Sequence, residues 1–170
     1  QNWMPSTPRP RPAVPEGTTR ICIAGFKLTH NGARAAALAK AIAAASPDIY
    51  EVWIYADNFG FRGTMKDGVV GGFLADIMEE LQPEDRTKFA QHKTAPFCWL
   101  ETGGDNKQLM LQGVGGRDRL CEWAAAKFPD DPRVQRLATT MPPIREAFCP
   151  GYKSAHIVKK ASVSNNAVPQ

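Results

Sequence analysis

The sequence predicts an α/β domain in which helices flank a four-stranded mixed sheet, with an extended arm at each end of the chain. Three observations favour this fold: a 170-residue length that suits one domain, β-branched and aromatic runs that alternate with stretches of helical period, and proline-rich ends. We expect residues 1–17 to be an extended arm and residues 18–130 the globular domain. Residues 131–170 would then add a C-terminal helix and an extended tail.

The first half of the domain is predicted to be a β-α-β unit. Residues 20–26 and 50–55 are short apolar runs typical of buried strands, and residues 33–45 between them repeat apolar side chains at helical spacing. Strands joined in this way are parallel, with a right-handed connection. The glycine-rich residues 58–72 that follow are predicted to form a loop.

The second half of the domain is predicted to be a helix, a β-hairpin and a last helix. We expect helices at 73–81, 117–128 and 133–139, further helical turns from Pro83 to residue 91, antiparallel strands at 96–101 and 108–114 and an extended tail over 154–170. Because strands and helices alternate along the chain, the whole pattern favours a mixed sheet covered by helices.

Charge and hydropathy exclude two classes of partner. The net charge of +4 and the pI near 9.0 are mildly basic, but the sequence has no dense stripe of Lys and Arg, so we expect no nucleic-acid binding. No apolar run approaches the roughly 20 residues needed to span a bilayer, so we expect no transmembrane segment.

The cysteines favour a reducing compartment. None of the four cysteines forms a Cys-x-x-Cys pair, and the three histidines are scattered, so we expect no metal site. Cys22 and Cys98 are predicted to be small buried side chains of strands, and Cys121 lies on the predicted helix over 117–128. Cys149 lies in a predicted loop and is the remaining candidate for a reactive thiol.

The order of elements resembles the thioredoxin fold, and three motifs over residues 20–128 resemble the glutaredoxin family. Glutaredoxins enter their first helix through a Lys-x-x-Cys-x-x-Cys segment, which matches residues 27–33 here. His30 stands where the family has its nucleophilic cysteine, and Ala33 where it has the resolving cysteine. The resemblance therefore implies a redox fold without the thiols that exchange disulfides.

The other two motifs resemble the glutathione cradle of that family. Thr94-Ala95-Pro96 matches a Thr-Val-Pro segment whose proline is cis, and Gly115-Gly116-Arg117-Asp118 matches the Gly-Gly-x-Asp signature that opens the last helix. Glycines allow close approach of a ligand to the backbone, and free amides at a helix N-terminus bind carboxylates. The resemblance implies a vestigial glutathione site at Lys27, His30, Thr94, Ala95, Pro96, Gly115, Gly116, Arg117 and Asp118.

These residues also have plain structural interpretations, which we keep open. His30 is expected to be an exposed loop histidine, since no nucleophile lies near it in sequence. Asp118 is expected to favour the helix N-terminus by charge alone. We therefore expect no catalytic residue and no cofactor, with glutathione binding as the alternative.

The predicted function is that of a non-catalytic, glutaredoxin-like accessory subunit of a large multiprotein complex. Two arms without apolar periodicity are typical of subunits that extend over their neighbours, and Trp3 is a candidate anchor in a partner's pocket. The chain begins at Gln1 and not at Met, which a cleaved presequence or an artificially chosen start would both explain. With the fold and the arms, we expect a mitochondrial complex: a respiratory complex or ATP synthase, with the mitochondrial ribosome as the next candidate. The alternatives are a glutathione-dependent oxidoreductase and a glutathione- or peptide-binding module.

Overall fold

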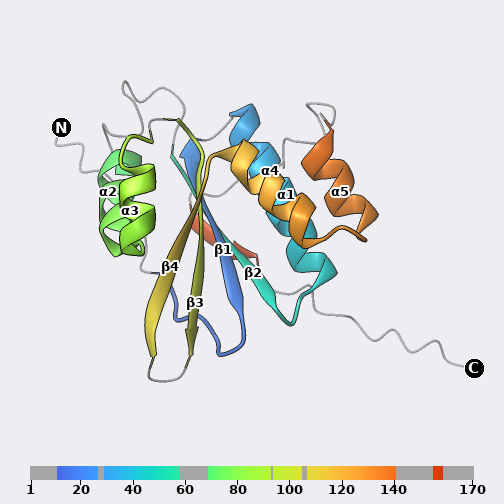
Figure 1. The fold of residues 1–170 in the computed structure, drawn as a ribbon, viewed down its shortest axis with the longest axis horizontal. Helices are drawn as coiled ribbons and strands as arrows, with labels where there is room; N and C mark the ends of the chain where they lie inside the picture. The colour runs from blue at the N-terminus through green and yellow to red at the C-terminus, as the bar shows by residue number, and fades with distance from the viewer. Residues whose placement is uncertain are drawn as a thin grey trace, which may run out of the picture.

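A computed structural model describes residues 11–26, 29–57, 69–92, 94–104, 107–140 and 155–158. The elements follow in the order β1 (Thr19–Phe26), α1 (His30–Ala45), β2 (Tyr50–Asp57), α2 (Val69–Glu80), α3 (Pro83–Phe89), β3 (Phe97–Gly104), β4 (Lys107–Gly115), α4 (Arg117–Lys127), α5 (Pro132–Thr139) and β5 (Ala155–Val158). Helices α2 and α3 lie on one side of the sheet, and α1, α4 and α5 lie on the other (Figure 1).

The sheet is mixed, and its strand order is β4-β3-β1-β2-β5. β1 and β2 are parallel, as expected for strands joined by a helical crossover, whereas β3 runs antiparallel to β1 and β4 antiparallel to β3. The prediction of an α/β domain with helices flanking a mixed sheet is therefore confirmed.

One strand was not predicted. Residues 155–158 were expected to belong to an extended tail, but they form β5, which pairs antiparallel with residues 52–55 of β2. The prediction failed because a four-residue edge strand needs only backbone hydrogen bonds with its neighbour. Such bonds leave no periodic pattern of side chains in the sequence.

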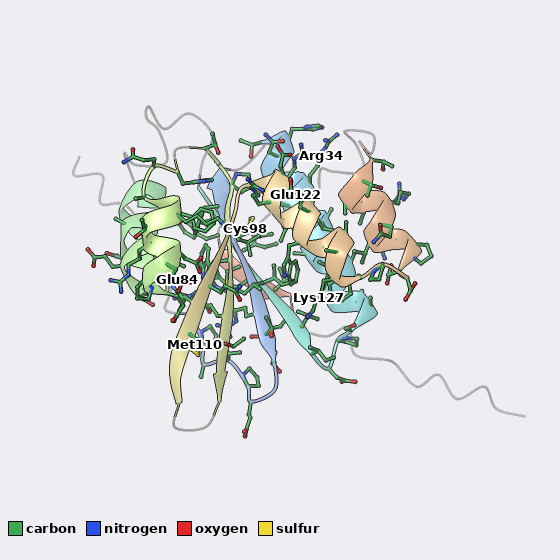
Figure 2. All side chains as sticks on the ribbon, viewed as in Figure 1. Arg34, Glu84, Cys98, Met110, Glu122 and Lys127 are labelled. Atoms are coloured by element: carbon green, nitrogen blue, oxygen red, sulfur yellow. The ribbon has the colours of Figure 1, made fainter. Side chains whose placement is uncertain are left out.

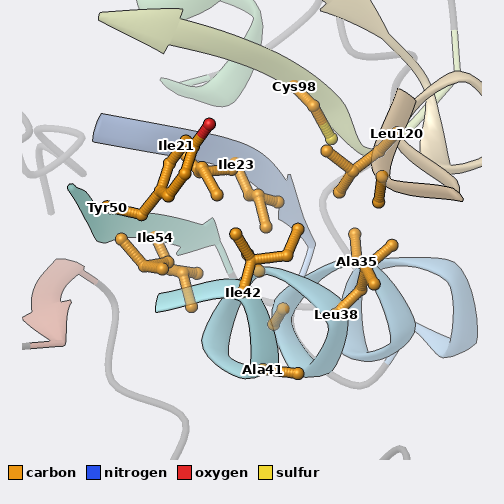
Figure 3. Packing of buried hydrophobic residues seen from close by; sticks show 14 of the residues in the cluster. Ile21, Ile23, Ala35, Leu38, Ala41, Ile42, Tyr50, Ile54, Cys98 and Leu120 are labelled. Carbon is orange, nitrogen blue, oxygen red and sulfur yellow. The ribbon is translucent and has the colours of Figure 1, made fainter. Parts of the chain in front are cut away.

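The face covered by α1, α4 and α5 holds a hydrophobic core that is mostly aliphatic. β1 contributes Ile21 and Ile23 to this face, and α1 contributes Leu38 and Ile42. Figure 3 shows these side chains interleaved between the helix and the strands. Because α1 is rich in alanine, its backbone comes close to the sheet and longer side chains fill only the gaps.

The opposite face is aromatic. Trp53, Phe97 and Trp99 point to this side of the sheet, where Ile77 of α2 and Phe89 of α3 cover them. Phe97 and Trp99 are stacked with 6.0 Å between ring centroids, and Trp53 lies 6.1 Å from Trp99. The strict alternation of strand side chains thus builds two cores of different composition on one sheet.

The helix boundaries depart from prediction in α1 and α2. α1 begins at His30, three residues earlier than predicted, because Ala33 already donates to the carbonyl of Thr29 at 3.0 Å. α2 begins at Val69, so Gly71 lies inside a helix rather than in the predicted loop. Residues 58–68 of that loop lie outside the described residues.

The C-terminal helix α5 belongs to the same core. Asp131 caps it by accepting a hydrogen bond from the Val134 amide at 2.9 Å, and Pro132 occupies its first turn. Val134 is fully buried in the cluster formed with α1 and α4.

The described part of the N-terminal arm lies on the chain's own sheet. We expected a partner surface to hold this arm, because a proline-rich segment has few ways to order itself. Instead Val14 is buried and Arg11 forms ion pairs with the domain, so residues 11–14 act as a strap across the aromatic face. Residues 1–10 lie outside the described part of the chain.

Candidate functional site

Two of the three sequence motifs meet at the end of the sheet where α1 and α4 begin. A cavity of about 380 Å³ lies there. It is lined by Asn31, His92, Thr94, Ala95, Pro96, Gly116, Arg117, Asp118 and Arg119. Six of the nine predicted site residues, from Thr94 to Pro96 and from Gly116 to Asp118, thus share one cavity.

The proline loop and the glycine turn are in close contact. The Ala95–Pro96 bond is cis, as predicted. A Cβ atom added at Gly116 would lie 3.8 Å from the Pro96 carbonyl oxygen and 3.9 Å from the Thr94 Oγ1, so the turn lies beside the loop as expected. Gly115 has φ +121°, a conformation that favours glycine, and it pairs with Cys98 of β3.

The N-terminus of α4 supplies hydrogen-bond donors to the cavity. The first bond within the helix is donated by Leu120 to the Gly116 carbonyl at 3.1 Å. The amides of Arg117, Asp118 and Arg119 therefore precede the helical ladder, and these residues line the cavity. Such an arrangement favours a carboxylate or another anion.

The charges around the cavity are mostly positive and partly paired. Arg117 forms an ion pair with Asp118 at 2.7 Å, and Arg119 forms one with Glu122 at 2.9 Å on the exposed side of α4. Arg34 of α1, only 6% exposed, lies at the same end of the molecule (Figure 2). Burial and the like charge of Arg117 lower the pKa of the Arg34 guanidinium.

His30 does not have the position that the sequence suggested. It is the first residue of α1 and is half-buried, so the expectation of an exposed loop histidine is wrong. Its Nε2 is buried and has no hydrogen-bond partner among the described residues. The neighbouring Asn31 lines the cavity instead, while Lys27 lies outside the described residues.

The cysteines that the structure describes are poor nucleophiles. Cys22 and Cys98 are fully buried, as expected, and burial is the main cause that raises the pKa of each thiol. The sulfur of Cys98 points toward Leu120 in the hydrophobic core (Figure 3). Cys121 is half-buried and its pKa is also raised, first by burial. Cys149 lies outside the described residues.

Three lining residues escaped the sequence analysis: Asn31, His92 and Arg119. A ring nitrogen of His92 donates a hydrogen bond to the Thr94 carbonyl at 2.6 Å, and the ring lies edge-on to Phe97 at 5.0 Å. His92 thereby supports the proline loop. No sequence pattern marks His92 as a site residue. Asn31 could have been predicted, because it follows His30 directly at the start of α1.

A second cavity, of about 690 Å³, lies at the other end of α4. Lys127, Glu84 and Met110 line it and are labelled in Figure 2, and Trp123 and Tyr50 form its aromatic wall. It holds no residue of the three motifs, so the smaller cavity remains the candidate site.

None of the described helices is long and apolar enough to cross a membrane. Among the described residues, no group of three or more His, Cys, Asp or Glu side chains is arranged to hold a metal ion. Comparison of the chain with protein-family models, with curated proteins and with solved structures finds no match.

Proposed function

We propose that this chain is a thioredoxin-fold protein of the glutaredoxin type that has lost thiol chemistry. The strand order β4-β3-β1-β2, the parallel β1–β2 pair and the antiparallel β3–β4 hairpin support this assignment, as do α1 and α4 on one face and α2 on the other. Two of the three family motifs meet in one cavity.

One observation carries the loss of thiol chemistry. His30 begins α1, at the position where the resemblance implies a nucleophilic cysteine, and Ala33 is buried one turn later. A helix N-terminus lowers the pKa of a thiol, but a histidine there cannot form a mixed disulfide. Cys22 and Cys98 do not replace it, because both are buried with raised pKa.

A gain-of-function variant tests this proposal. We expect the wild-type chain to reduce a glutathione mixed disulfide no faster than the uncatalysed reaction, and His30→Cys to form a mixed disulfide with glutathione detectable by mass spectrometry. Asp48→Cys, in the turn after α1, is the matched control for a new thiol elsewhere. Wild-type turnover that is lost in Cys98→Ser or Cys149→Ser would contradict the proposal.

We further propose that the protein works as an accessory subunit of a large mitochondrial complex: a respiratory complex or ATP synthase, with the mitochondrial ribosome as the next candidate. The support is a redox-type fold without redox thiols, joined to residues 1–10 and 159–170, whose sequence has no apolar periodicity. Residues 11–14 dock on the domain, so deletion of residues 1–10 removes the arm and keeps the strap.

The subunit role is tested by native co-purification with mass spectrometry. We expect the full chain to migrate with a large assembly, and the variant without residues 1–10 to lose occupancy there. Trp3→Ala is expected to weaken docking by about 2 kcal/mol if this side chain is a buried anchor. A native chain that migrates as a monomer would overturn this role.

A glutathione-binding module is the second candidate, and the 380 Å³ cavity favours it. The resemblance implies that Gly116 and Asp118 hold the γ-glutamyl group and that Ala95 offers its backbone to the ligand's cysteine. Calorimetric titration with S-methylglutathione decides the question: binding is expected to be lost in Asp118→Asn and kept in Glu122→Gln, a control on the same helix. Binding unaffected by either variant would place the ligand elsewhere.

A further inference from the structure

One arginine of the strap is inserted among charged and aromatic side chains of the domain. The Arg11 side chain is 11% exposed, although it belongs to a segment without helix or strand. Its guanidinium carbon lies 5.8 Å from the ring centroid of Trp53 and 5.9 Å from that of Trp99. Its Nη2 lies 3.4 Å from Glu80 Oε2 of α2, and its Nε contacts Glu101 Oε1 of β3.

The carboxylate that receives Arg11 is held by the sheet and not by the strap. Glu101 is 0% exposed and accepts hydrogen bonds from Trp99 Nε1 at 3.0 Å and from Arg20 Nη1 at 3.2 Å. Arg20, 1% exposed, is itself held by Glu51 at 2.7 Å. Because β1, β2 and β3 supply all these groups, the contacts that hold Glu101 from the sheet include no residue of the strap.

The backbone of the strap is bound as well. Arg20 donates from Nη1 to the Pro12 carbonyl at 2.6 Å and from Nη2 to the Ala13 carbonyl at 3.1 Å. Val14 packs beside Gly103, where an added Cβ would lie 3.5 Å from the Val14 Cβ. These contacts use carbonyl oxygens, so proline at position 12, which lacks an amide hydrogen, loses nothing there.

The carboxylates of the domain around Arg11 favour the binding of a cation there. Without Arg11, the ion-pair network contains the carboxylates of Glu51, Glu80 and Glu101 and the single guanidinium of Arg20. The network then carries a net charge of −2, and one further cation reduces this to −1. Of the three carboxylates, Glu101 is fully buried, Glu51 is 22% exposed and Glu80 is 52% exposed. A planar guanidinium also stacks on indole rings, which an ammonium group does less well.

We propose that Trp53, Glu80, Trp99 and Glu101 form a guanidinium-binding slot that takes the arginine of an extended Arg-Pro segment. In the isolated chain the ligand is the chain's own strap, with Arg11 in the slot and the carbonyls of residues 12 and 13 bound by Arg20. The slot fixes the position of Arg11, the residue to which residues 1–10 are joined. This proposal does not depend on the subunit role or on glutathione.

A peptide titration of the full chain tests the slot. In Arg11→Ala the slot lacks its ligand, and an acetylated peptide with the sequence of residues 10–15 is added while tryptophan fluorescence is followed. We expect this peptide to bind at least tenfold more tightly than the same peptide with citrulline, a neutral isostere, in place of arginine. A third peptide, with lysine in place of arginine, should bind with an affinity between those two. The wild-type chain should bind the arginine peptide at least tenfold more weakly than Arg11→Ala does.

Equal affinity for the arginine and citrulline peptides, or equal binding by the wild-type and Arg11→Ala chains, would overturn the proposal. A measurement on the wild-type chain covers the case in which Arg11→Ala does not fold. The δ protons of Arg11 should show an upfield ring-current shift in the NMR spectrum, because the Arg11 guanidinium carbon lies 5.8 Å and 5.9 Å from the centroids of two indole rings. Those of Arg133, an exposed arginine of α5, should not. The absence of that shift at Arg11 would equally refute the slot.

Discussion

The two faces of the sheet bury side chains of different kinds. On the face covered by α1, α4 and α5, the hydrophobic side chains of the buried cluster are aliphatic apart from Tyr50 and Cys98. On the face covered by α2, α3 and the strap, tryptophans surround a buried network of Arg20 and Glu101. We call the first the helical face and the second the strap face. The helical face is stabilised by the burial of apolar area, whereas the strap face also depends on ion pairs that specify where the strap lies.

The difference teaches which substitutions each face tolerates. An aliphatic core accepts another apolar side chain of similar volume at small cost. A buried charge network does not accept the loss of one member, because the remaining charge stays without compensation. Four predictions, from the largest expected effect to the smallest, use this contrast.

The strap face should be most sensitive at Glu101. Glu101→Gln removes the only fully buried carboxylate of the described residues and leaves Arg11 and Arg20 without their shared counter-charge. We expect a loss of about 3–5 kcal/mol in the free energy of unfolding, measured by urea denaturation. Glu122→Gln, which breaks an exposed pair on α4, should cost less than about 1 kcal/mol. Equal losses in the two variants would contradict the contrast.

The helical face should respond to lost volume. Leu38→Ala, at a fully buried position of α1, should cost about 3 kcal/mol because it leaves a cavity between the helix and the sheet. Leu38→Met keeps most of the volume and should cost less than about 1.5 kcal/mol. If the methionine variant were as unstable as the alanine variant, shape rather than volume would control this face.

The contact between α3 and β4 should be sensitive to a single added methyl group. A Cβ at Gly113 would lie 2.6 Å from the Phe89 ring, and the Gly113 amide donates to Asp85 of α3 at 2.8 Å. Gly113→Ala should therefore cost about 1–3 kcal/mol by thermal or urea unfolding. The control is Gly103→Ala, whose Cβ would be no closer than 3.4 Å to its neighbours. A neutral Gly113→Ala would show that α3 moves freely on the sheet.

The two buried thiols should make both faces sensitive to alkaline pH. Burial raises the pKa of Cys22, helped by Glu101, and the pKa of Cys98, helped by Cys121. A buried thiol whose pKa is raised in the folded chain does not affect the free energy of unfolding below the unfolded pKa near 9. Above that pH the thiol ionises readily only in the unfolded chain, so the free energy of unfolding falls as the pH rises. Each thiol should contribute a loss of about 1.4 kcal/mol per pH unit above pH 9. Cys22→Ala or Cys98→Ala should reduce the slope of unfolding free energy against pH, and an unchanged slope in both would refute this origin.

Local patterns were sufficient for much of the fold. Short apolar, β-branched and aromatic runs predicted the strands around Ile21 and Trp99, and helical period predicted α1 and α4, because both signals reside in neighbouring residues. The motifs also predicted that Pro96 is cis and lies beside Gly116. The glutaredoxin resemblance, the function and the mitochondrial location stay predictions.

Other features had no local signal. β5 forms through backbone pairing with β2, and His92 reaches the cavity because a turn brings its ring beneath Thr94. His30 was assigned to a loop because α1 was predicted to begin at the alanine run. Its true start depends on a hydrogen bond from Ala33 to Thr29, and the sequence does not encode that bond as a pattern.

The sequence alone determined the two-sided pattern of the strands and the absence of a cysteine between residues 27 and 33, because a side chain's face and chemistry follow from its position in the chain. Only the tertiary structure decided how Arg11, Arg20 and Glu101 meet. Glu101 lies far from both arginines in sequence, and its burial becomes favourable only when the sheet brings the two guanidinium groups to it. The position of the proline-rich strap therefore depends on ion pairs between residues that are distant in sequence.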